Sequence, residues 1–277
     1  MPIRCRLAGP LVVLALCGMV AHGADAPDKK KSADNLADNA RTVLAAVVKA
    51  AGDNHRLPQR SGVDGVAFRR TDDELTAYYI RTAAKAAREL PEKDAAPAFL
   101  LALGIALDDS TTVRGNLLTR RLWHKVESGE ARKLRLSVLG EPMLFGRHDL
   151  AQHFAVSAAL TATAGPESAE SAGVLKEMLD SRAGGSGFSF ADLSADFAGI
   201  AFARRLLDKP SRLVGIEKSF RTADYALSPR GLPEGLTAEQ FAKQYGSLKD
   251  ERYLRLQSDI RKRIAELPGY KDMAKGK

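Results

Sequence analysis

The segment from Gly146 to Leu207 constrains the fold more than any other part of the chain. Plotted at about 100° per residue, its helical stretches near 148–164, 167–182 and 190–208 are apolar on nearly every side. A helix without a polar face must be covered by other parts of the protein. We therefore predict a buried central unit of three helices.

The rest of the chain has the pattern of amphipathic helices. Three helix starts have the capping-box arrangement, a hydroxyl followed by a carboxylate or amide in the same turn: Thr71–Glu74, Thr237–Gln240 and Ser247–Asp250. No segment alternates apolar and polar residues as a strand would. The predicted class is all-α, a multi-helix bundle without a sheet. Further helices are expected near 34–51, 72–90, 93–108 and 111–128, and short helices within 211–268. A loop is expected at 52–70 and a break in the helices at Leu139–Gly146.

Composition divides the chain into regions. Residues 25–33 are polar and turn-rich, and we predict a disordered tether there. Residues 34–137 contain amphipathic Ala/Leu-rich helices, 146–208 the apolar central helices, and 209–277 basic helices and a tail. We expect the helices from 34 to 268 to form one continuous domain.

The first 24 residues are typical of a secretory signal peptide. They contain two arginines, an apolar run from Leu11 to Ala21 and small residues at the end. We expect export to the periplasm or cell envelope, which would leave a formal charge of +6 on the mature chain. Cleavage would also remove Cys5 and Cys17, so no disulfide is expected. Lipidation at Cys17 stays open as the alternative, although Leu16 stands where a small residue is usual.

Each of the three central helices carries ionisable residues along one stripe. Asp149 and His153 are four positions apart and share a face, and so do Asp192 and Asp196. Two of the stripes contain a glycine, which lets helix backbones approach closely. The sequence therefore predicts a buried cluster formed by Asp149, His153, Glu177, Asp180, Asp192 and Asp196, supported by Lys176, Ser189, Gly173 and Gly199.

Two kinds of site would explain this cluster. Buried carboxylates are costly unless they are paired, hydrogen-bonded or bound to a cation. The cluster is then either a structural network around Lys176 and Arg147 or a site for a divalent metal, the one cofactor that we expect. Simpler explanations exist for single residues: Asp149 suits the helix dipole, Asp192 follows a capping serine, and His153 can be a hydrogen-bonded core residue.

The same region carries a resemblance to a known family. In this order, the chain contains HF, KEMLDS, GSGFSFADLSADFAG and FA. These motifs resemble the core of the YfiM-like lipoproteins of the bacterial envelope, a family without an assigned function, over residues 147–203, and more distantly the VanZ-like membrane proteins. The matching positions are His153, Phe154, Lys176, Glu177, Asp180, Ser189, Asp192, Asp196 and Gly199. The resemblance implies an envelope location and a shared polar core.

Basic stretches are the remaining feature. Arg114–Arg135 contains seven Lys or Arg against two Glu, and the chain from Arg252 to Lys277 is again rich in cations. Because export would separate the protein from nucleic acid, we expect anionic lipid or cell-wall polymer as the partner. A solvated helix face is the simpler alternative. No segment after the signal is long enough to span a membrane.

Three functions remain open. The preferred one is a non-catalytic envelope protein whose polar core is structural or binds a cation. The alternatives are a metal-dependent hydrolase of an envelope phosphate or glycan, and a scaffold that docks partners through its basic ends. His148–Asp149 has the order of a metal-dependent HD phosphohydrolase, with His124 upstream, but GEPMLFGR precedes it where that family has an apolar run.

Overall fold

The fold is an assembly of helices, as predicted. The computed structural model describes residues 27–58, 68–116 and 119–275. Within these residues it contains thirteen α-helices, two 3-10 helices and no strand, only three isolated bridges. The all-α class is therefore confirmed, while the predicted signal peptide, Cys5 and Cys17 lie outside the described residues.

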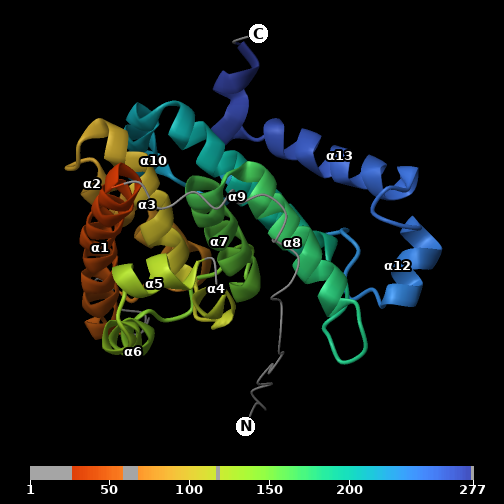
Figure 1. Ribbon diagram of the computed structural model, residues 1–277, viewed down its shortest axis with the longest axis horizontal. Helices are drawn as coiled ribbons and strands as arrows, with labels where there is room; N and C mark the ends of the chain where they lie inside the picture. Colours follow the sequence, from red (N-terminus) through yellow and green to blue (C-terminus); the bar gives the residue numbers. More distant parts are fainter. Residues whose placement is uncertain (1–26, 59–67, 117–118, 276–277) are drawn as a thin grey trace.

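The N-terminal helices form one side of the molecule (Figure 1). α1 (Pro27–Arg56) packs against both α2 (Asp72–Ala87) and α3 (Glu92–Leu107). The short helices α4 (Thr112–Gly115), α5 (Arg120–Val126) and α6 (Gly129–Val138) follow, and α5 and α6 contact α1.

The buried centre consists of three helices from two parts of the chain. α7 (His148–Ala164) contacts both α3 and α9 (Phe190–Asp208). Every residue of 98–107 and of 190–200 is buried. α8 (Pro166–Asp180) packs on α7 and α9 but buries only the stripe Ala169, Gly173 and Glu177. α3 thus belongs to the centre together with α7 and α9, and α8 lies at its edge.

The C-terminal helices extend along one side of this centre. η1 (Pro210–Arg212), α10 (Leu213–Ser219) and α11 (Thr222–Tyr225) lead to α12 (Ala238–Tyr245), α13 (Glu251–Ala265) and η2 (Pro268–Lys275). α12 and α13 form an arm in Figure 1. Their rings Phe241 and Tyr253 pack with Phe188 and Phe190, so aromatic contacts fix the arm to the start of α9.

The element boundaries correct two predictions and add one helix that was not predicted. Helix α1 already begins at Pro27, so residues 27–33 of the predicted tether are helical, with proline at the first helical position, where its missing N–H costs nothing. The helix predicted at 111–128 is instead two helices, α4 and α5. After α5, the Ser128 side chain accepts a hydrogen bond from the Ala131 N–H and starts α6, which the sequence analysis missed.

A buried ion pair connects these short helices to the centre. Arg135 and Glu127 have side chains that are 1% exposed, and Arg135 Nε donates to Glu127 Oε1 at 2.7 Å. The same guanidinium donates to the carbonyls of Ala106 and Asp108 at the end of α3. Part of the basic stretch that suggested a partner is therefore used inside the fold.

Candidate functional site

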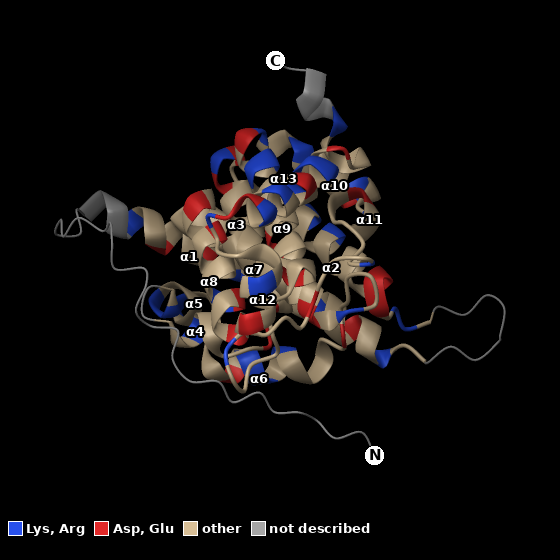
Figure 2. Ribbon diagram, turned by 90° about the vertical axis from the view of Figure 1, so that its right-hand side faces the viewer, with Lys and Arg blue, Asp and Glu red and all other residues tan. Residues whose placement is uncertain are grey.

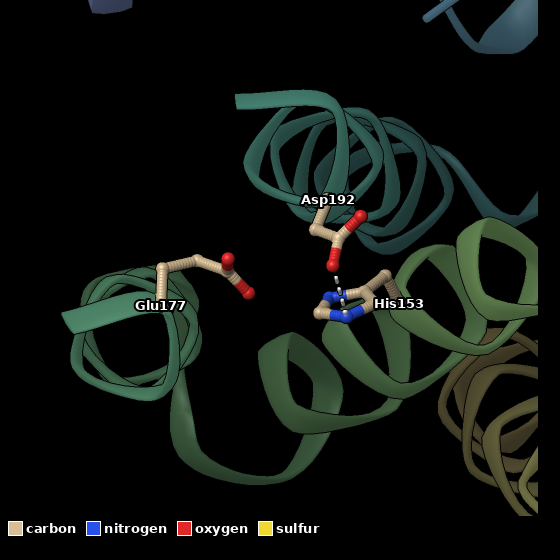
Figure 3. Close-up of side chains that lie close together, drawn as sticks. All are labelled: His153, Glu177 and Asp192. Carbon is tan, nitrogen blue, oxygen red and sulfur yellow. Dashed lines mark ion pairs between the residues drawn. The ribbon is translucent and has the colours of Figure 1, made fainter. Parts of the chain in front are cut away.

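Three of the predicted cluster residues meet at one point. His153 comes from α7, Glu177 from α8 and Asp192 from the first turn of α9 (Figure 3). One donor atom from each lies within 4.8 Å of the other two. The helical stripes that contain these residues face one another because α7, α8 and α9 all pack together.

Both ring nitrogens of His153 face carboxylates. Nδ1 lies 3.1 Å from Asp196 Oδ1, and Nε2 lies 3.4 Å from Asp192 Oδ2. Burial alone would lower the pKa of His153, but the carboxylates of Asp196 and Asp192 outweigh it and raise the pKa to about 9. In this arrangement the ring is a protonated imidazolium that bridges two aspartates.

Glu177 is the most buried acid of the cluster. Its side chain has no exposed surface, and burial raises its pKa to about 7. The backbone N–H of Ser189 donates to Glu177 Oε2 at 2.9 Å, and the Lys176 ammonium lies 3.1 Å from Oε1. Burial would lower the pKa of Lys176, but Glu177 and Asp180 raise it, so the group stays charged.

Asp192 is held by the cap of its own helix and by an arginine. Ser189 accepts a hydrogen bond from the Asp192 N–H, and its hydroxyl donates to Asp192 Oδ1 at 3.0 Å. Arg147 donates to the same oxygen at 3.0 Å and also pairs with Asp149 and Glu234. The predicted cap is therefore present, and it also orients the carboxylate.

Asp196 lies behind the histidine. Its Oδ1 accepts hydrogen bonds from His153 and, at 2.6 Å, from the Ser157 hydroxyl. Its Oδ2 is buried and has no hydrogen-bond partner among the described residues. A Cβ at Gly173 of α8 would lie 2.5 Å from this oxygen, so the missing side chain of Gly173 makes room for the carboxylate.

The other two predicted acids lie at the rim. Asp149 pairs with Arg147, its Oδ1 accepting from Arg147 Nε at 3.1 Å, and no contact joins it to His153. Asp180 pairs with Lys176 at 2.8 Å, and about a third of its side chain is exposed. Gly199 holds no ligand, but it sets the distance between helices, since its Cβ would lie 2.1 Å from the Phe154 carbonyl oxygen.

Two participants were missed by the sequence analysis. Ser157 follows His153 by four positions, so the same helical stripe contains it and could have revealed it. Glu234 lies in the loop before α12 and reaches Arg147 from a distant part of the chain. No local sequence pattern predicts such a long-range contact.

The one cavity described among these residues does not include the cluster. This cavity of about 530 Å³ lies elsewhere, between the end of α1, the start of α2 and the segment between α6 and α7, and none of the cluster residues lines it. The cluster reaches solvent at its rim, where the side chains of Arg147 and Lys176 are 30% and 40% exposed. The spacing of the three donor atoms suits a single metal ion.

The chain was compared with models of protein families, with curated proteins and with solved structures. None of these comparisons finds a match. The resemblance over residues 147–203 therefore stays an expectation from the sequence motifs.

Proposed function

We propose that the protein binds a divalent cation at His153, Glu177 and Asp192. The observation that carries this proposal is the convergence of their donor atoms from three helices, within 4.8 Å of one another. A divalent cation would compensate the buried acids, whose desolvation is otherwise costly. The carboxylate of Asp196, buried behind His153, adds negative charge, and its Oδ2 has no hydrogen-bond partner among the described residues.

The hydrogen bonds around the three residues support this assignment. Each has one polar atom already held: Asp196 accepts from His153 Nδ1, Ser189 N–H donates to Glu177 Oε2, and the Ser189 hydroxyl donates to Asp192 Oδ1. The atoms proposed to bind the ion are His153 Nε2, Glu177 Oε1 and Asp192 Oδ2, and of these Glu177 Oε1 also accepts a hydrogen bond from Lys176. A carboxylate that accepts from the second nitrogen of a ligating histidine is a usual partner in metal sites.

The donor set indicates the kind of ion. One imidazole nitrogen and two carboxylate oxygens suit Zn²⁺ or Mn²⁺ better than Mg²⁺ or Ca²⁺, which prefer oxygen ligands alone. We propose Zn²⁺ and Mn²⁺ as the ions to test. Once the imidazole has lost its Nε2 proton, Asp196 holds the remaining proton on Nδ1.

The first prediction concerns binding itself. The purified protein should bind about one Zn²⁺ or Mn²⁺ per chain in titration calorimetry, and elemental analysis after dialysis should find the ion. His153→Ala, Glu177→Gln and Asp192→Asn should abolish binding because each removes a ligand. Asp196→Asn should weaken binding about 10- to 100-fold, since it removes only the group that orients the histidine.

Asp149→Asn is the matched control for these variants. It removes an acid of the same cluster that contacts Arg147 rather than the converging atoms, so binding should be nearly unchanged. If the protein binds neither ion while Glu177→Gln lowers its stability, the cluster is a structural network and the proposal is wrong.

The ligand count supports a second candidate function. Three protein ligands leave coordination positions for water, as in catalytic zinc sites. A metal-dependent hydrolase would then lose hydrolysis of a phosphomonoester such as p-nitrophenyl phosphate in His153→Ala. Simple cation binding is preferred because the convergence of the three donor atoms supports it directly, whereas hydrolysis also needs a substrate site beside them.

We propose an envelope location on the pattern of residues 1–24 and on the family resemblance. N-terminal sequencing of the protein from a periplasmic extract should find a start near residue 25. None of the helices among the described residues combines the length and the apolar character needed to cross a bilayer.

Binding of anionic lipid or cell-wall polymer stays a prediction, and the charge pattern gives it little support. Figure 2 shows Lys and Arg intermixed with Asp and Glu over α13. Arg255 pairs with Glu251, and Arg261 with Glu170. These pairs favour a solvated helix face over a scaffold that docks partners through this end.

A further inference from the structure

Lys176 already donates a hydrogen bond to one of the oxygens that would bind the proposed ion. Its ammonium lies 3.1 Å from Glu177 Oε1, the oxygen that remains after Ser189 N–H has taken Oε2. The lysine side chain is 40% exposed, whereas Glu177 is fully buried. The ammonium therefore reaches the buried carboxylate from the solvent side of α8.

A divalent ion and this ammonium exclude each other at Glu177. An ion bound to Oε1 would stand within a few ångströms of the lysine nitrogen, where two positive charges repel strongly in a partly buried site. The ammonium would have to leave Oε1 as the ion arrives. Its long, half-exposed side chain allows that movement without a change in the helix.

A second carboxylate is in place to receive the lysine. Asp180 is one helical turn after Lys176, and its Oδ2 lies 2.8 Å from the ammonium. Asp180 is 32% exposed, so it lies closer to solvent than Glu177. The ammonium can give up Glu177 and keep Asp180, moving outward along the same face of α8.

We propose that Lys176 is a built-in counterion for Glu177 that a divalent ion displaces, and that Asp180 is the carboxylate that holds the displaced ammonium. This inference rests on the proposed cation site. In this proposal Asp180 binds the displaced ammonium and is not a ligand of the ion. It also explains how the ion-free protein keeps a fully buried glutamate, because the lysine compensates its charge.

A double-mutant cycle tests this exchange, with Mn²⁺ and Zn²⁺ affinities measured by titration calorimetry on the full chain. Lys176→Met should bind the ion at least about tenfold more tightly than the unmodified protein, because the competing charge is gone. Asp180→Asn should bind about two- to fivefold more weakly, since the displaced ammonium loses a partly exposed partner. In the Lys176→Met background, Asp180→Asn should have no effect.

The cycle separates the possible failures. If Asp180→Asn weakens binding equally in both backgrounds, Asp180 acts on the ion directly and the exchange is wrong. Unchanged or weaker binding by Lys176→Met would also overturn it, provided that circular dichroism shows a folded variant. Lys176→Gln, which keeps a polar side chain without the charge, serves as the second variant and should bind more tightly too. Absence of binding in every protein would instead contradict the cation site itself.

Discussion

At the scale of single residues, the two histidines of α7 each lie between two hydrogen-bond acceptors. His153 lies between Asp192 and Asp196. His148 has Nδ1 at 2.9 Å from the Pro142 carbonyl oxygen and Nε2 at 3.1 Å from Asp109 Oδ2. Only an imidazolium can donate from both nitrogens, so the His148 ring is charged in this arrangement.

His148 predicts a pH dependence of stability. Its hydrogen bond to Asp109 raises its pKa above the ordinary 6.5, although burial would lower it. The Pro142 carbonyl and the Glu141 charge also raise this pKa. A raised pKa means that the folded state binds the proton more tightly than the unfolded chain. The stabilisation is therefore complete below about pH 6.5 and is lost as the pH rises through the higher folded pKa.

His148→Gln removes this contribution. Urea unfolding measures the difference in unfolding free energy between the unmodified protein and this variant. The difference should be largest at about pH 6 and smallest at about pH 9. Asp109 stays ionised throughout, because its hydrogen bond with His148 lowers its pKa. A difference that is constant or grows toward alkaline pH would contradict the assignment.

The partners of His153 show which part of the cluster could be predicted from the sequence and which part could not. Helical spacing correctly placed ionisable groups on the facing stripes of three helices. It paired His153 with Asp149, which instead pairs with Arg147, two positions before it. The true partners, Asp192 and Asp196, come from another helix, and a choice between a local and a tertiary partner depends on packing distances that periodicity does not contain.

At the scale of helices, the contact between α7 and α9 depends on the lack of a side chain at Gly199. A Cβ there would lie 2.1 Å from the Phe154 carbonyl oxygen, a backbone atom that cannot move by itself. Gly215, on an exposed part of α10, has no atom within 4 Å of its would-be Cβ. The two glycines therefore give a matched pair of substitutions.

Gly199→Ala should lower the unfolding free energy by about 1–3 kcal/mol or more, because α9 must move away from α7. Gly215→Ala should raise it by about 0.5–1 kcal/mol, since alanine loses less conformational freedom than glycine in a helix. Thermal and urea unfolding measure both. Equal effects of the two substitutions would show that the helices have room to spare at Gly199.

Helix starts show which local signals are reliable. Thr237 and Gln240 form the complete predicted capping box. Thr71 makes no cap hydrogen bond; nearby, Asp73 accepts from the N–H groups of Phe145 and Gly146 and ties the start of α2 to the segment before α7. Near Ser247 the helix begins later, at Glu251, with Asp250 as its cap. Tertiary hydrogen bonds are made near the helix start in the first case, and in the second Asp250, a capping residue about as good as serine, takes the place of Ser247.

At the scale of the whole molecule, one cluster of buried side chains runs from Ala37 in α1 to Tyr270 in η2. The proposed ion joins three helices of this assembly. An ion that binds only the folded state stabilises it according to its free concentration relative to its dissociation constant. Binding of the ion should therefore be detectable as an increase in the stability of the whole protein.

At an ion concentration about 100 times the dissociation constant, the melting temperature should rise by roughly 5 °C or more, which corresponds to about 2.7 kcal/mol. A chelator should reverse the rise, and Glu177→Gln should show none. Differential scanning calorimetry with and without Zn²⁺ or Mn²⁺ provides the measurement. A melting temperature that is the same with and without the ions would argue against a site in the folded state.

The stretch that supplies the donor atoms has a consequence for folding. His153, Glu177 and Asp192 lie on three consecutive helices joined by short connections. Contacts of small sequence separation form quickly, because little chain entropy is lost in closing them. Early in folding, α7, α8 and the start of α9 can thus bring these three residues together before α12 and α13 have docked. Glu234 then pairs with Arg147, and Phe241 of α12 packs against Phe188.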